Sequence, residues 1–168
     1  MKKGTLYFFT GLSGAGKTTI GGEFFRRMKA RKNDIVLFDG DLTRPLYGVD
    51  FGYSTEGRKQ SARVEFNFIR MLTEQGIDVV SCAIAMYDEI RAWNRANIEN
   101  YVEIYVRVSM DTLYRRDQKQ LYSSGTKQVV GVDLPWDEPK NPDFVIDNDG
   151  SETPDEIVTR LERQLGLI

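Results

Sequence analysis

The sequence predicts an α/β fold in which helices cover both faces of a five-stranded parallel sheet. Short apolar runs with the composition of buried strands occur at residues 5–10, 35–38, 79–85, 102–108 and 144–146. A polar or helical stretch follows each run, and strands that alternate with helices form parallel sheets. We therefore expect one α/β domain that spans residues 1–168.

Three segments have the periodicity of amphipathic helices. One runs from residue 17 to about residue 31, a second includes residues 62–72, and the last begins after Thr153. Thr153 is a predicted N-cap, with Pro154 at the first helical position and Glu156 completing a capping box. We expect apolar stripes to pack these helices on the sheet, namely Ile20, Phe24 and Met28, then Ala62, Phe66, Ile69 and Leu72, then Ile157, Leu161 and Leu165.

Composition limits the classes of protein to which the chain can belong. The 168 residues are 40% apolar and 29% charged, which is typical of a globular enzyme. The net charge of -2 provides no global positive electrostatic field that would attract nucleic acid. The apolar run at residues 6–9 is too short for a signal peptide, and the single Cys82 forms no intramolecular disulfide. We expect a cytoplasmic protein without a membrane partner. Histidine is absent, which leaves Asp, Glu, Lys or water as general base.

A glycine-rich motif follows the first strand. Residues 11–18 read Gly-Leu-Ser-Gly-Ala-Gly-Lys-Thr, so backbone amides can surround phosphates, Lys17 can reach the β- and γ-phosphates, and Thr18 can ligate Mg²⁺. The motif predicts a P-loop phosphotransferase with the nucleoside-kinase-like P-loop NTPase fold. The alternative interpretation of the motif is a glycine-rich turn that arose by chance. The residues expected to bind ATP are Gly11, Ser13, Gly14, Ala15, Gly16, Lys17, Thr18 and Thr19.

Two carboxylates come directly after the second predicted strand. Asp39 and Asp41 should lie at the carboxyl edge of the sheet, where open α/β folds bind ligands. In the absence of histidine, Asp41 is our candidate for the catalytic base that receives the acceptor proton, and Asp39 for the magnesium site. The alternative is a solvated turn with a helix N-cap.

Several residues downstream suit a nucleotide acceptor. Arg44, Arg58 and Arg63 can bind anions, and Tyr53 can stack on a base. Each arginine, considered singly, could instead be a solvated surface residue. No apolar run ends in the Asp-x-x-Gly of switch GTPases, which favours a small-molecule kinase.

Residues 118–142 lack sustained periodicity and contain three of the five prolines. A segment of this length in a compact domain is typical of a mobile lid that excludes water from phosphoryl transfer. Trp136 lies within it and could either seal the acceptor site or anchor the lid.

Taken together, the motifs resemble those of the adenylyl-sulfate kinase family, whose members phosphorylate the ribose 3′-hydroxyl of adenosine 5′-phosphosulfate with magnesium ATP. The resemblance extends along most of the chain. It rests on residues 11–19, 38–44, 51–58, 101–106, 116–122 and 131–139, which include an Arg-Asp-Gln-Lys-Gln-Leu-Tyr segment and a Gly-Val-Asp-Leu-Pro-Trp-Asp-Glu-Pro segment.

The resemblance implies roles for individual residues. Asp41 would be the base, and Arg116 would be a lid residue near ATP. A homodimer is compatible with the resemblance, because such kinases are often dimers. The residues expected to bind the acceptor are Asp41, Arg44, Tyr53, Arg58, Ser61, Arg63, Lys119, Leu121 and Val130.

The sequence departs from the family in the acceptor pocket. The family holds adenine between two Phe rings, whereas Tyr53 and a position near Val129 replace them here, and Gly57 and Ser61 replace the family's Asp and Asn. Ala85 stands where some relatives have a serine, so transfer should be direct.

The sequence therefore leaves two candidate acceptors, adenylyl sulfate and cytidine diphosphoramidate. Cytidine diphosphoramidate is the acceptor of a similar kinase in capsule biosynthesis. The alternatives are another small-molecule kinase, of the gluconate or shikimate type, and an ATP-binding module that has lost its acceptor.

Overall fold

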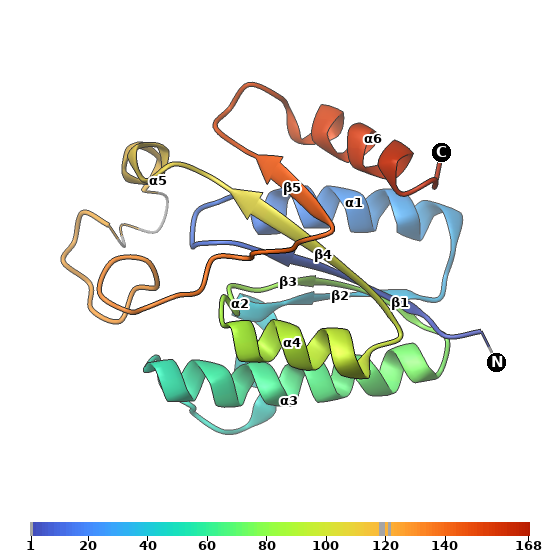
Figure 1. Cartoon of the computed structure of the whole chain (residues 1–168), viewed down its shortest axis with the longest axis horizontal. Coiled ribbons are helices and arrows are strands. Elements are labelled where there is room, and N and C mark those ends of the chain that lie inside the picture. Colours follow the sequence, from blue (N-terminus) through green and yellow to red (C-terminus); the bar gives the residue numbers. More distant parts are fainter. Residues whose placement is uncertain (1, 118–119, 121) are drawn as a thin grey trace.

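The computed structural model describes residues 2–117, 120 and 122–168. Within them, all strands of the sheet run parallel in the order β2-β3-β1-β4-β5, as the apolar runs predict (Figure 1). The strand bounds are Thr5–Thr10 for β1, Ile35–Asp39 for β2, Asp78–Cys82 for β3, Asn100–Arg107 for β4 and Phe144–Asp147 for β5.

Helices cover both faces of this sheet (Figure 1). One face carries α1 (Lys17–Arg31) and α6 (Pro154–Gln164), and the other carries α3 (Thr55–Glu74) and α4 (Asp88–Asn97). The helix α5 (Met110–Arg116) and the segment that begins at residue 122 lie beyond the carboxyl ends of the strands, and the last residues of this segment run back along the sheet to the start of β5. Two short helices, α2 (Gly40–Thr43) and η1 (Arg44–Tyr47), follow β2. Among the described residues, no helix combines the length and apolarity needed to cross a bilayer.

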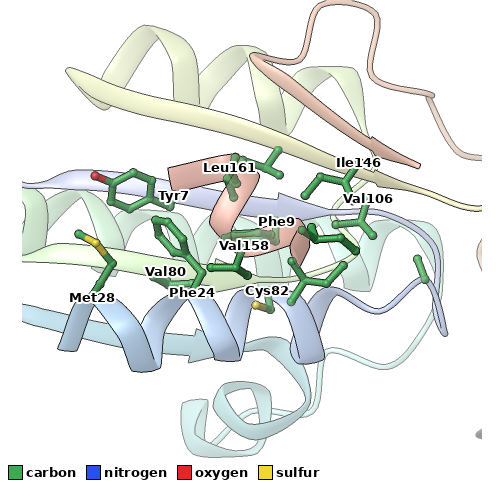
Figure 2. Packing of buried hydrophobic residues seen from close by; sticks show 14 of the residues in the cluster. Tyr7, Phe9, Phe24, Met28, Val80, Cys82, Val106, Ile146, Val158 and Leu161 are labelled. Atoms are coloured by element: carbon green, nitrogen blue, oxygen red, sulfur yellow. The ribbon is translucent and has the colours of Figure 1, made fainter. Parts of the chain in front are cut away.

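The main core lies between the sheet and the helices α1 and α6. Figure 2 shows Phe24 and Met28 of α1 directed toward strand side chains, and the ring centroids of Tyr7 and Phe24 are 5.0 Å apart. The predicted stripes of the first and last helices are buried there, with Leu165 at the margin. Cys82 belongs to the same cluster, and burial raises the pKa of its thiol to about 12, which indicates a packing residue.

Helix ends follow the local sequence signals closely. The first helix has the predicted bounds, and the side chains of Thr153 and Glu156 form both hydrogen bonds of the predicted capping box.

The third strand ends earlier than predicted, at Cys82, and Ala85 has a φ of 32°. This left-handed backbone conformation cannot continue a strand.

Helix α4 has no counterpart among the predicted helices. Its inner face combines Ile90 and the partly buried Trp93 with the polar Arg91 and Asn94. This short apolar pair was the available signal, and the sequence interpretation did not use it.

The second half of the predicted lid is tied to the body of the protein. The Asp137 amide donates to the Met86 carbonyl at 2.8 Å, and an Asp137 carboxylate oxygen accepts from the Asp88 amide at 2.9 Å. Trp136 packs against a cluster that includes Leu12 and Tyr105. Trp136 therefore anchors this segment, which answers the question that its position in the sequence raised.

The packing of α1 against the sheet yields a paired test. A Cβ added to Gly21 would lie 2.3 Å from Cys82 Sγ and 3.3 Å from a ring carbon of Phe9. We expect Gly21→Ala to lower the free energy of unfolding by about 1–3 kcal/mol through overpacking, although alanine is the better helix former.

The adjacent Gly22 is the matched control, because a Cβ there would have no heavy atom within 4 Å. Gly22→Ala should raise the free energy of unfolding by about 0.5–1 kcal/mol. Urea denaturation measures both values, and a Gly21→Ala protein as stable as the parent would contradict the observed packing.

Candidate active site

A pocket of about 850 Å³ lies at the carboxyl edge of the sheet, between the glycine-rich loop, the end of β2 and the start of α3. Most residues that the sequence nominates for ATP and acceptor binding come together in it. They are Ser13, Gly14, Gly16, Lys17, Thr18, Thr19, Asp39, Asp41, Arg44, Tyr53, Arg58 and Ser61.

The glycine-rich loop leads into α1 through a left-handed residue. Gly16, the N-cap, has a φ of 101°, and a Cβ there would lie 2.4 Å from Asn148 Nδ2. Asn148 donates from that nitrogen to the Ala15 carbonyl at 2.8 Å. Glycine is therefore required at position 16 by both its backbone conformation and its neighbour.

Lys17 is buried at the first position of α1. Its Nζ donates to the Leu12 carbonyl at 2.8 Å, so the ammonium group lies within the loop that precedes the helix. A positive charge beside the amides at a helix N-terminus is suited to polyphosphate.

Thr18 and Asp39 join the loop to the end of β2. Thr18 Oγ1 donates to Asp39 Oδ2 at 2.6 Å, while Asp39 Oδ1 accepts from the Asp41 amide at 3.0 Å. Asp39 therefore caps α2, as the alternative interpretation proposed, and also contacts the predicted magnesium ligand Thr18.

This hydroxyl and carboxylate fit a magnesium site of the kind found beside bound phosphates. Among the described residues there is no group of three or more acidic or cysteine side chains that could enclose a metal. Mg²⁺ bound with nucleotide needs no such group, because it takes one or two protein ligands and fills its shell with water and phosphate oxygens.

The opposite wall of the pocket is cationic and aromatic. The guanidinium carbons of Arg44 and Arg58 lie 4.5 and 5.3 Å from the ring centroid of Tyr53. Arg58 also donates from Nε to the Tyr53 carbonyl at 3.0 Å and from Nη2 to the Gln128 carbonyl at 2.9 Å. Burial lowers the pKa of Arg58 from its usual value. These two arginines can bind an anion beside a stacking surface.

Other nominated residues lie elsewhere. Arg63 donates to Glu89 at 2.8 Å on the exposed surface of α3, and Val130 is buried in the cluster around Trp136. Neither belongs to the pocket wall within the part of the chain that the structure describes. Lys119 and Leu121 lie outside the described residues.

Arg116 ends α5, beside the glycine-rich loop but outside the described pocket wall. Its Nη2 donates to the Asn148 carbonyl at 2.7 Å, and Asn148 in turn contacts Ala15. Arg116 is therefore linked to the predicted ATP site through one intervening residue.

Sequence reasoning missed three residues of this region. Tyr122 donates from its hydroxyl to the Ser13 carbonyl at 2.7 Å, Asn148 contacts Ala15, and Glu65 lines the pocket. Asn148 comes two residues after the apolar run at residues 144–146, so its position after a predicted strand was the available signal. Glu65 lies on the apolar stripe of α3, where a carboxylate requires a reason for its burial.

The fold and this pocket define a P-loop kinase. The chain belongs to the adenylyl-sulfate kinase family, because the family profile described as Adenylylsulphate kinase matches residues 3–147. This confirms the resemblance on which the sequence interpretation rests.

Individual relatives agree with this assignment. The chain is 36% identical over 166 residues to the cytidine diphosphoramidate kinase of Campylobacter jejuni, and the alignment covers 96% of each chain. It is 35% identical over 173 residues to the adenylyl-sulfate kinase of Picosynechococcus, which covers 99% of this chain and 97% of the relative.

Among solved structures, the Mycobacterium tuberculosis APS kinase in complex with AMPPNP and APS matches with a TM-score of 0.86, 26% identity and 99% coverage of both chains. A shikimate kinase from Aquifex aeolicus matches with a TM-score of 0.60 at 16% identity, which shows a common fold. The shikimate-type alternative is not favoured.

Arg58 and Arg63 provide a paired test of the pocket wall. Arg58→Ala should lower kcat/KM for the acceptor by about 10- to 100-fold, because it removes hydrogen bonds from a charged donor. Arg63→Ala should change kcat/KM by less than about twofold, because Arg63 pairs with Glu89 outside the described pocket wall and such an exposed ion pair also contributes little to stability. Steady-state kinetics with varied acceptor measure both values, and an equal loss in the two variants would contradict the pocket described above.

Proposed function

We propose that this kinase transfers the γ-phosphoryl group of magnesium ATP to the ribose 3′-hydroxyl of a nucleotide that carries a small anionic 5′ group. One observation carries the proposal: Lys17 and Thr18 of the glycine-rich loop share a single pocket with Asp41, Arg44 and Arg58. The donor and the acceptor can therefore meet in one cavity.

The donor half of the site would bind ATP through the glycine-rich loop. The amides of residues 13–16 and the Lys17 ammonium would contact the β- and γ-phosphates. Thr18 and Asp39 would hold Mg²⁺, directly or through water, and the ion would neutralise charge that develops on the phosphate oxygens.

The acceptor half would orient the hydroxyl and receive its proton. In this step the 3′-oxygen bonds to the γ-phosphorus, the bond from that phosphorus to the β–γ bridging oxygen breaks, and Asp41 accepts the hydroxyl proton. ADP leaves with the bridging oxygen. Arg44 and Arg58 would bind the anionic 5′ group.

The shape of the pocket favours a cytidine diphosphoramidate-type acceptor over adenylyl sulfate. Tyr53, 57% exposed, offers one ring for stacking, and Val129 and Val130 are buried away from the described pocket wall. A stack with one wall suits the smaller pyrimidine better than a purine. The C. jejuni relative, named as a cytidine diphosphoramidate kinase, supports the same choice.

Several predictions about the wider context rest on this proposal. A cytoplasmic location, a role in capsule biosynthesis and a homodimer are all consistent with a kinase that acts on a small nucleotide. We likewise propose that residues 118–142 act as a lid over the substrates and that Lys119 and Leu121 bind the acceptor.

The acceptor can be identified by turnover. We expect ATP consumption to depend on cytidine diphosphoramidate, with adenylyl sulfate turned over at a kcat/KM lower by roughly tenfold or more, because loss of one stacking wall costs about 1–3 kcal/mol. Phosphorus NMR of the product locates the new phosphate on the ribose. An ATP-binding module would consume ATP at the same rate with and without acceptor.

The donor site can be tested at Lys17. Lys17→Ala should lower kcat by about 10²–10³-fold, because a charge that stabilises the transferring group is removed. Lys29→Ala, near the exposed end of the same helix, is the control and should leave kcat unchanged. A Lys17→Ala enzyme with near-normal turnover would refute the assignment of the glycine-rich loop.

A further inference from the structure

Glu65 is a buried carboxyl group in the wall of the active-site pocket. It lies on the inner face of α3 with 4% of its surface exposed, and it is distinct from the glycine-rich loop and from the two pocket arginines. Burial of a carboxyl group is costly unless hydrogen bonds satisfy its oxygens. The contacts of Glu65 therefore indicate why a carboxyl group is present there.

Three hydroxyl groups from three different elements donate to this carboxyl group. Oε2 accepts from the Tyr47 hydroxyl at 3.0 Å, and Oε1 accepts from Ser81 Oγ at 3.2 Å. Oε2 also lies 3.1 Å from Thr43 Oγ1, which shares its one proton between Glu65 and the Asp39 carbonyl at 2.9 Å. Thr43 ends α2, Tyr47 ends η1, and Ser81 lies fully buried in β3. Glu65 thus links the α2–η1 segment to α3 and to the sheet.

The α2–η1 segment, residues 40–47, stacks the Tyr47 ring on Phe68 of α3, with ring centroids 6.4 Å apart, and otherwise has little apolar anchorage. Among its described residues none is buried, and Leu42 and Leu46 are 71% and 80% exposed. Yet it carries Asp41 and Arg44, the proposed base and one of the anion-binding arginines. Because burial does little to hold this segment, the hydrogen bonds to Glu65 attach it to α3.

We propose that Glu65 is a positioning residue that holds the α2–η1 segment, and with it Asp41, in place against the donor half of the pocket. The inference rests on the proposed function insofar as Asp41 is the base. Glu65 acts through Thr43 and Tyr47 and does not itself contact the reacting atoms. Misplacement of a reacting group by about 1 Å can lower a rate by about 100-fold, so such an attachment bears directly on kcat.

Hydrogen bonding, and not negative charge, is the property that this role requires. Burial raises the pKa of Glu65, whereas the hydrogen bonds with Tyr47, Thr43 and Ser81 act in the opposite direction. A glutamine can replace it: the amide oxygen accepts from Thr43 and Tyr47, and the amide nitrogen donates to Ser81 Oγ. Leucine has a similar size but accepts no hydrogen bond.

The test compares Glu65→Gln with Glu65→Leu. We expect Glu65→Leu to lower kcat by about 100-fold while the KM for ATP changes by less than about twofold, because the glycine-rich loop does not contact Glu65 in the described structure. Glu65→Gln should keep kcat within about threefold of the parent enzyme. Near-parental kcat in Glu65→Leu, or equal losses in both variants, would overturn the proposal.

Glu162 provides the matched control. It is a glutamate of similar burial, 2% exposed, but it pairs with Arg27 and Arg31 on the opposite face of the sheet. Glu162→Leu should lower stability and leave kcat per folded molecule unchanged. An equal loss of kcat in this variant would show that Glu65 acts through general stability and would overturn the positioning role.

Hydrogen–deuterium exchange tests the attachment of residues 40–47 by Glu65 independently of which reaction the enzyme catalyses. In Glu65→Leu, amides of residues 40–47 should exchange faster, while amides of residues 11–18 should be unaffected. Unchanged exchange at residues 40–47 would overturn the attachment whatever the substrate. If the parent enzyme turns over neither acceptor, the proposed function fails, and faster exchange at residues 40–47 would still support the attachment.

Discussion

The parallel direction of the five strands in the described part of the chain is the constraint on which the rest of the structure depends. Parallel strands place their carboxyl ends at one edge of the sheet, so segments far apart in the sequence meet there. The glycine-rich loop follows β1, Asp39 ends β2, and Asn148 follows β5. The pocket exists because these strand ends converge.

The two halves of the pocket are built from different kinds of interaction. The donor half continues directly into α1, whose apolar stripe is buried against the sheet, and it is therefore held by the main core. The acceptor half includes the exposed α2–η1 segment, which polar contacts to Glu65 attach to α3. A rigid donor site thus faces an acceptor site whose geometry depends on a few hydrogen bonds.

Residues 122–142 join both halves to the rest of the fold. Tyr122 contacts the glycine-rich loop through Ser13, and the Gln128 carbonyl accepts from Arg58 at the acceptor side. Further along, Asp137 and Trp136 tie the segment to α4 and to the cluster beneath it. Any closure over substrate would therefore start from a segment that is attached at its far end.

The sequence by itself determined where the strands lie along the chain, the P-loop and the cap of the last helix, because buried runs, glycine spacing and capping signals act between near neighbours. It also named many of the polar residues in the pocket wall, since Asp39 and Asp41 directly follow a predicted strand. Only the tertiary structure decided that Arg63 pairs with Glu89 and that Glu65 joins three elements. The partner of a side chain depends on long-range packing, which the spacing of residues along the chain does not encode.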